Sequence, residues 1–363
     1  MARPGRDGAP ARGRLPLLLN DGTPGPSQPS RRSGSRPESR LPFPDRPVLF
    51  FGGKGGVGKT TMAAVAALDM AARGHRTLLV STDPAHSTGD VLQAELGDRP
   101  RQVAEGCWAM EVDPEREADR YIEAVKSRVE SAAPPRLLGE VYRQIDIARV
   151  SPGAAESALF DRFTRILEEE GKGYDRIVFD TAPTGQTLRL LSLPELMTTW
   201  IGGLIKRRKK VGALSQMWKN VAGSEATDLE HDPLLRALEE RRDRFQEARR
   251  ILTDSRRTAF VFVLIPERLP IWETEKAVAA LSKHGVPVGA IVVNLALPER
   301  DGGVGEDPLF AARRERQAAY LARISQSFGD WPVLRVDLQD ADPVGVDALR
   351  RVPVIETAEE VVR

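Results

Sequence analysis

Residues 48–60 of the chain read VLFFGGKGGVGKT, and this stretch decides the fold. Its first four residues form a short apolar run, which predicts a buried β-strand. The following eight residues, 53–60, fit the phosphate-loop pattern G-x-x-x-x-G-K-[ST]. The glycines let the backbone curl so that successive N–H groups point inward at phosphate oxygens. Residues 60–73 continue with apolar residues at helical spacing, which predicts a helix. The positive N-terminal end of this helix would add to the attraction of the loop for phosphate.

The loop sequence assigns roles toward ATP and Mg²⁺ to individual side chains. Lys59 can reach the β- and γ-phosphates, and the Thr60 hydroxyl can coordinate Mg²⁺. A chance match to this pattern is on the order of one in a hundred from background residue frequencies, and this match also lies between a predicted strand and a predicted helix. The predicted nucleotide-binding residues of the loop are Gly53, Lys54, Gly55, Gly56, Val57, Gly58, Lys59, Thr60 and Thr61.

Apolar strands alternate with helices along the rest of the chain. Such continuous apolar strands indicate a mostly parallel sheet covered on both faces. The predicted fold is therefore an α/β P-loop NTPase domain over residues 47–363. Residues 193–254 contain no strand candidate and are interpreted as an inserted helical subdomain. The predicted strands cover residues 77–81, 108–112, 177–179, 257–265, 290–294 and 333–336, and the predicted helices cover residues 114–130, 154–170, 270–284 and 311–327.

Two aspartates come directly after predicted strands. Asp83 lies in STDPAHS (81–87), and Asp180 ends the apolar run Ile-Val-Phe. Ligands bind at the carboxyl ends of the strands in open α/β sheets. We therefore predict that Asp180 holds the Mg²⁺ shell and that Asp83 holds the attacking water. Because ordinary carboxylates are weak bases near neutral pH, positioning the water is favoured over early removal of its proton.

Three segments together carry a family resemblance. FGGKGGVGKTT (51–61), STDPAHS (81–87) and DTAPTGQTLRLL (180–191) look like the P-loop, first switch and second switch of the arsenite-pump and guided-entry ATPase family, whose members include tail-anchored-protein-targeting factors. AMEVDP (109–114), SPGAAES (151–157) and ERLPIWETEKAV (267–278) agree with it. The resemblance implies a homodimer that closes around two ATP molecules and opens after hydrolysis.

Two further residue roles are implied by the resemblance. In related families with a lysine directly after the first glycine of the loop, here Lys54, that lysine reaches across the dimer to the partner's nucleotide. Asn294 is implied to contact the adenine ring. The alternatives are a solvated loop lysine at position 54 and a strand-end turn residue at position 294.

The sequence departs from the family pattern at two places. Gln186 stands where the second switch usually has histidine. Glutamine keeps the hydrogen-bonding capacity of this position but lacks the titratable ring of histidine. Arsenite is soft and is bound in this family through three thiolates, but Cys107 is the only cysteine of the chain. The residues therefore do not support arsenite sensing, and Cys107 is predicted to be a core or turn residue.

Composition limits the other possible classes. The net charge of +1 over 363 residues provides no overall positive potential that would attract nucleic acid. No nucleic-acid partner is therefore expected. The single cysteine favours a cytoplasmic location, and no apolar run approaches the roughly 20 residues that span a bilayer. Residues 1–46 are rich in Pro, Arg, Gly and Ser, which predicts a disordered tail, with a basic arm for an anionic partner as the alternative.

The helical insertion and the overall function leave alternatives open. Residues 194–218 combine Leu, Met, Ile and Trp with a basic run at 206–210, which suits a groove for a hydrophobic client, a helix pair packed on the core, or a membrane surface. The predicted function is ATP hydrolysis that drives the opening and closing of a dimer, with the cargo open. The alternative is a Min/Par-type positioning ATPase that binds membrane or DNA.

Overall fold

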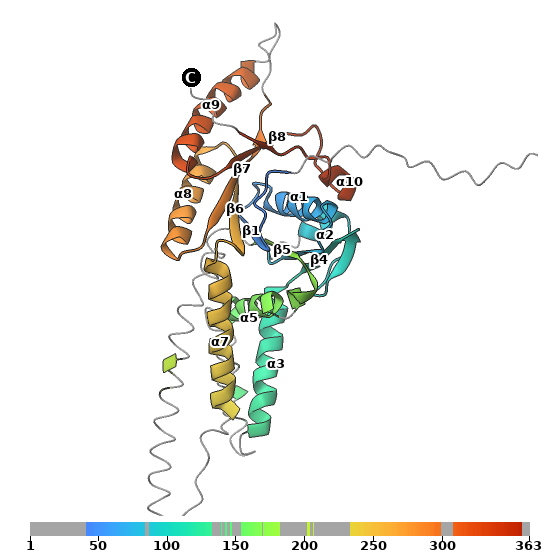
Figure 1. Ribbon diagram of the computed structural model, residues 1–363, viewed down its shortest axis with the longest axis vertical. Helices are drawn as coiled ribbons and strands as arrows, with labels where there is room; N and C mark the ends of the chain where they lie inside the picture. Colours follow the sequence, from blue (N-terminus) through green and yellow to red (C-terminus); the bar gives the residue numbers. More distant parts are fainter. Residues whose placement is uncertain are drawn as a thin grey trace, which may run out of the picture. The chain divides into compact units, whose positions relative to one another are not determined.

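The computed structural model describes residues 41–83, 87–132, 154–168, 170–181, 233–298 and 308–357, with a few isolated positions between 139 and 206. These residues form one nine-stranded sheet with helices on both faces (Figure 1). The strands are β1 (Val48–Gly52), β2 (Thr77–Ser81), β3 (Arg101–Ala104), β4 (Cys107–Glu111), β5 (Arg176–Asp180), β6 (Thr258–Leu264), β7 (Val288–Ala296), β8 (Val333–Asp337) and β9 (Ile355–Glu356). The helices are α1 (Lys59–Ala72), α2 (Ser87–Leu92), α3 (Pro114–Ala132), α5 (Ala154–Glu168), the 3₁₀ turn η1 (Glu170–Gly173), α7 (Pro233–Thr253), α8 (Arg268–Lys283), α9 (Pro308–Phe328) and α10 (Val346–Leu349).

The sheet has the order β3-β4-β2-β5-β1-β6-β7-β8-β9. The strands from β4 to β8 in this order pair in parallel, and only the two edge strands, β3 and β9, pair antiparallel. The predicted mostly parallel α/β fold is therefore confirmed. β5 lies between β1 and β2 and is parallel to both. The carboxyl ends of these three neighbouring strands therefore meet where β1 leads into the P-loop.

Alternate residues of β1 divide the core between the two faces of the sheet. Phe50 belongs to the core under α5, α7, α8 and α9, whereas Leu49 and Phe51 belong to the core under α1 and α10. Phe50 stacks on Phe179 of β5 at 4.9 Å and on Phe260 of β6 at 5.9 Å between ring centroids. Such aromatic pairs add about 0.5–1.5 kcal/mol each to the burial of the rings. The central strands that carry the site are thus fixed on both faces.

Helices α3, α5 and α7 pack together on the α5 side of the sheet. Figure 1 shows α3 and α7 extending away from the sheet, and both pack against α5. α7 lies within the stretch interpreted as a helical insertion, but its C-terminal half contributes Phe245, Ala248 and Ile251 to the core. No helix among the described residues is long and apolar enough to cross a membrane.

The structure contains elements that the sequence pattern did not predict. β3 and β9 are short edge strands with exposed or half-buried residues, so they lack the apolar run that marks the central strands. α2 is a six-residue helix and α10 a four-residue helix, too short for a helical period to be visible. Residues 41–46, which the sequence assigned to the tail, contribute Phe43, which is buried against Phe51 with 5.8 Å between ring centroids.

Candidate active site

The phosphate loop and both predicted aspartates lie at one edge of the sheet. The loop leaves β1, Asp180 ends β5, and Asp83 follows β2. β5 pairs with both other strands, and Phe51 and Ser81 each lie opposite Asp180 in the register. The sheet therefore brings together residues that are separated by about a hundred positions in the sequence, at the carboxyl ends of parallel strands where ligands bind.

Three glycines of the loop adopt a backbone that other residues avoid. Gly53 has φ 154°, Gly56 has φ 81° and Gly58 has φ 89°. A Cβ atom at Gly53 would collide with the carbonyl oxygen of Val263, and one at Gly58 would collide with the amide nitrogen of Asn294. The loop thus approaches β6 and β7 so closely that only glycine fits at these positions.

Asn294 lies on β7 beside this loop. Its side chain is buried, and its Nδ2 donates a hydrogen bond to the carbonyl oxygen of Val57 at 2.9 Å. The side chain therefore braces the backbone of the phosphate loop. A contact between Asn294 and adenine remains a prediction.

Lys59 and Asp83 face each other at the first turn of α1. Lys59 Nζ lies 3.7 Å from Asp83 Oδ2, and the two residues are only 5% and 9% exposed. A buried ammonium group needs a negative partner, and here a carboxylate lies beside it. The γ-phosphate that Lys59 is predicted to contact would be a second anion within reach of the same ammonium group.

Asp180 is surrounded by hydroxyl groups. Its Oδ2 accepts hydrogen bonds from Thr60 at 2.7 Å, from Thr88 at 3.4 Å and from Ser81 at 3.5 Å. The Thr60 hydroxyl also lies 3.1 Å from the Ser87 hydroxyl. The sequence identified Thr60 and Asp180, but it missed Ser81, Ser87 and Thr88. Ser81 and Ser87 both lie in the quoted segment STDPAHS, so the signal was present without an assigned role.

The second carboxylate oxygen of Asp180 differs from the first in its hydrogen bonding. Oδ1 is buried and has no hydrogen-bond partner among the described residues. A buried carboxylate oxygen without a partner is costly unless water or a cation satisfies it. The residues therefore fit the predicted Mg²⁺ shell, because Thr60 donates its proton to Oδ2 and keeps an oxygen lone pair for a cation.

The metal-binding residues form a sparse set. The part of the chain that the structure describes contains no cluster of three or more His, Cys, Asp or Glu side chains that could hold a metal. Mg²⁺ in nucleotide sites is commonly held by one or two protein oxygens together with substrate phosphates and water. Thr60 and Asp180 match this pattern.

Burial changes the acidity of Asp180. Desolvation and the neighbouring Asp83 raise the pKa of its carboxyl group, against the opposing effects of the Thr60 hydrogen bond and the Lys59 charge, so that the resulting pKa is about 6. The ionised form is therefore held at an energetic cost in the free protein, and a bound cation would relieve that cost.

This raised pKa predicts a pH-dependent difference in stability between the wild type and Asp180→Asn. The folded carboxyl keeps its proton up to about pH 6, whereas the unfolded carboxyl loses it near pH 3.9. The stabilisation is complete below pH 4 and is lost as the pH rises through 6. In metal-free buffer, the wild type should therefore lose about 2–3 kcal/mol more unfolding free energy than Asp180→Asn between pH 4 and pH 7.5. Urea denaturation of both proteins measures this, and a pH-independent difference would contradict it.

Lys54 is held by its own chain in the structure. Its Nζ lies 3.7 Å from Glu273 Oε1 in α8, and the side chains are 36% and 38% exposed. The motif GKGGVGKT therefore places one lysine, Lys59, inside the site and another, Lys54, at the surface. The predicted action of Lys54 on a partner's nucleotide remains a prediction.

Some predicted features lie outside the described residues. They include Gln186 and the rest of the second switch after Thr181, residues 84–86 of the first switch, and nearly all of residues 194–218. Cys107 is described, and it is the buried first residue of β4. Burial raises the pKa of its thiol to about 12. This thiol is therefore protonated at neutral pH and is a poor metal ligand.

Comparison with known proteins gives consistent matches over this domain. A family described as "Anion-transporting ATPase" matches residues 46–355. The chain is 33% identical over 303 residues to "Putative arsenical pump-driving ATPase 2" of Aquifex aeolicus, which covers 84% of this chain and 96% of that protein. It is 32% identical over 307 residues to "ATPase ASNA1 homolog 1" of Paramecium tetraurelia, with coverages of 84% and 90%. It is 33% identical over 320 residues to "ATPase GET3C" of Arabidopsis thaliana, with coverages of 84% and 81%.

Proposed function

This chain belongs to the anion-transporting ATPase family and is an ATPase, and on that premise we propose that it hydrolyses Mg²⁺-bound ATP to open and close a homodimer. The observation that supports this most directly is the meeting of Lys59, Thr60, Asp83 and Asp180 at the ends of β1, β2 and β5. These residues supply a phosphate-binding cation, a metal-binding pair and a carboxylate for water.

The proposed division of labour follows from the geometry. The loop N–H groups and Lys59 bind the phosphates, and Thr60 and Asp180 orient the metal side of the nucleotide. Mg²⁺, when bound, neutralises charge that develops on the β- and γ-phosphate oxygens. Asp83 accepts a hydrogen bond from the attacking water and holds it in line with the γ-phosphate. Because Asp83 lies 3.7 Å from Lys59, water and phosphate are brought next to each other.

Asp83→Asn tests both the hydrolytic role and the dimer. The variant should bind ATP with near-normal affinity and hydrolyse it at least about a hundredfold more slowly, because an amide orients the water poorly. Bound ATP should then persist, and light scattering should show a stable dimer with ATP and Mg²⁺ that is absent with ADP. A variant that remains monomeric with ATP bound would overturn the proposed dimer cycle, and a collapse of ATP affinity would make Asp83 a binding or structural residue.

The response to metalloids follows from the cysteine content. Some relatives are named as arsenical pump-driving ATPases, but this chain has a single cysteine, and its thiol has a pKa of about 12. Arsenite and antimonite should therefore leave the ATPase rate unchanged within a factor of two or so, because three thiolates are needed for a soft site. Steady-state phosphate release measures this. A several-fold stimulation that survives Cys107→Ser would reveal a metalloid site of another kind.

The cargo is proposed only as a class. The family resemblance and the apolar and basic composition of residues 194–218 favour a hydrophobic client protein, with a membrane surface as the second possibility. The Min/Par-type alternative is not favoured, because the matched family and the named relatives are of the arsenical-pump, ASNA1 and GET3 type. The predicted cytoplasmic location stays part of the proposal.

A further inference from the structure

The backbone of β7 is irregular where the strand ends beside the phosphate loop. Between Val293 and Ala296, β7 has one more residue than β8 has opposite to it. Such a β-bulge redirects side chains and is frequent next to functional sites. Leu295 lies in the bulge with φ 54°, in the left-handed region that leucine rarely adopts. Its side chain is 42% exposed, whereas Asn294 is 5% exposed and bonds the loop.

The bulge determines how Asn294 meets the phosphate loop. Asn294 Nδ2 donates to the carbonyl oxygen of Val57 at 2.9 Å, and a Cβ atom on Gly58 would lie 2.2 Å from the same nitrogen. Because a hydrogen bond weakens steeply when its geometry changes, a small shift of the strand end would change the support of the loop. A residue in an unfavourable backbone conformation persists only where its surroundings hold it, so the bulge needs a firm support.

Gln317 on α9 supplies this support directly after the bulge. The Leu297 N–H donates to Gln317 Oε1 at 2.7 Å, and Gln317 Nε2 donates to the carbonyl oxygen of Leu297 at 3.1 Å. One side-chain amide thus pairs with both backbone groups of Leu297, as a neighbouring strand would. Arg335 also donates to the carbonyl oxygen of Leu297, at 3.0 Å, and Arg314 donates to that of Pro298, at 2.7 Å. The backbone after the bulge is therefore held by side chains of β8 and α9.

The packing of α9 explains why Gln317 reaches this segment. The buried residues of the helix, Ile324 and Phe328, lie toward its C-terminal end and join the core. Gln317 is seven residues before Ile324, so both side chains lie on the same face of the helix. The apolar end of α9 thus directs the half-buried Gln317 toward the end of β7.

We propose that Gln317 is a positioning residue for nucleotide binding, because it holds the end of β7 in the conformation in which Asn294 supports the phosphate loop. This inference rests on the proposed nucleotide site, and Gln317 acts on that site through the backbone of Leu297 and through Asn294. Without the side-chain amide, the bulge can relax toward a regular strand. Part of the interaction free energy of the nucleotide is then used to order the loop again, which weakens binding.

Isothermal titration calorimetry with ADP and Mg²⁺ measures the proposed role. Gln317→Ala should bind ADP about fivefold to tenfold more weakly than the wild type, because it loses two hydrogen bonds to the segment that positions Asn294. Gln317→Met keeps a side chain of similar length without the amide, so it should lose as much affinity as the alanine variant. In steady-state assays, the KM for ATP should rise by a larger factor than kcat falls, as expected for a loss of binding.

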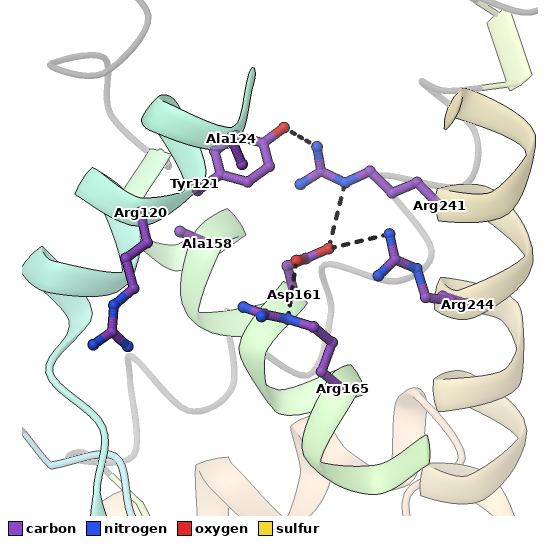
Figure 2. A pocket seen from close by; sticks show the side chains of 8 residues that line it. All are labelled: Arg120, Tyr121, Ala124, Ala158, Asp161, Arg165, Arg241 and Arg244. Atoms are coloured by element: carbon purple, nitrogen blue, oxygen red, sulfur yellow. Dashed lines mark hydrogen bonds and ion pairs between the residues drawn. The ribbon is translucent and has the colours of Figure 1, made fainter. Parts of the chain in front are cut away.

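Two controls separate this effect from a general loss of stability. Gln326→Ala changes the same residue type at an exposed position of α9. Arg244→Gln removes an ion pair between α7 and Asp161 of α5, in the cavity that Figure 2 shows. Both variants should bind ADP like the wild type. Equal weakening in Gln317→Ala and Arg244→Gln would show a general effect of stability and would overturn the proposal.

A double variant determines whether Gln317 acts through Asn294. In the Asn294→Ala background, Gln317→Ala should change the ADP affinity by less than about twofold, because residues that act through one another are not additive. The same loss in both backgrounds, or wild-type ADP affinity in Gln317→Ala, would overturn the role of Gln317 and leave the nucleotide site in place. Absence of ADP binding in the wild type would instead contradict the proposed nucleotide site itself.

Discussion

A Lys59→Ala variant should hydrolyse ATP at least about a thousandfold more slowly than the wild type. Lys59 is the first residue of α1 and is 5% exposed, with its ammonium group 3.7 Å from Asp83. Alanine removes the cation that is proposed to bind the β- and γ-phosphates. Water that enters the space cannot replace the fixed positive charge of a preorganised site. Steady-state phosphate release and ATP binding should be measured on the same preparation.

The same substitution has a second expected effect, on the metal side of the site. The positive charge of Lys59 lowers the pKa of Asp180, so its loss should raise that pKa further and weaken Mg²⁺ binding near neutral pH. The control is Lys283→Ala, which removes an exposed lysine at the end of α8 and should leave turnover unchanged. Near-normal turnover in Lys59→Ala would show that this lysine has no catalytic role.

The parts of the site that could be predicted from the sequence are those encoded locally. The phosphate loop is a contiguous motif, and the ends of apolar runs locate Asp83 and Asp180. The hydroxyls of Ser81 and Thr88 could not be predicted in the same way. Ser81 meets Asp180 through the register of β2 against β5, and Thr88 meets it through the placement of the short helix α2. The bracing of Val57 by Asn294 likewise depends on β7 lying beside the loop.

The fold shows the same division between local and long-range information. The central strands were predictable because both faces of the sheet are covered, which makes each strand a continuous apolar run. β3 and β9 were missed because they lie at the edges of the sheet, where their residues are exposed or half-buried and form no continuous apolar run. The core contacts of α7 were also unpredictable, because Phe245 packs on Phe160 of α5 from far along the chain, with 5.1 Å between ring centroids.

Lys54→Ala should lose about 10³–10⁵-fold in hydrolysis while it retains most of its ATP affinity. This expectation rests on the proposed dimer, in which Lys54 of one subunit stabilises charge on the partner's γ-phosphate, as an arginine finger does. In the single chain, Lys54 pairs with Glu273 at 3.7 Å, and both side chains are about one third exposed. Exposed ion pairs contribute only about 0–1 kcal/mol, so leaving Glu273 costs little when a partner's nucleotide becomes available.

Mixing two inactive variants determines in which subunit Lys54 acts. Lys54→Ala and Asp83→Asn should each be inactive alone. In a mixed dimer, the Lys54→Ala subunit keeps Asp83 and receives an intact Lys54 from its partner, so one of the two sites should recover activity. Titration of one variant into the other should therefore give a maximum in phosphate release at a near-equal ratio, with mixed dimers confirmed by native mass spectrometry.

The outcome of this mixing experiment separates two geometries of catalysis. Recovery of activity requires that the loop lysine reach across the dimer, because no subunit in the mixture carries both Lys54 and Asp83. If Lys54 instead served its own nucleotide, the Lys54→Ala subunit would lack the lysine and the Asp83→Asn subunit would lack the water-positioning carboxylate, so mixed dimers would stay inactive. Mixed dimers that form and remain inactive would therefore assign Lys54 to its own site or show that the two sites fire only together.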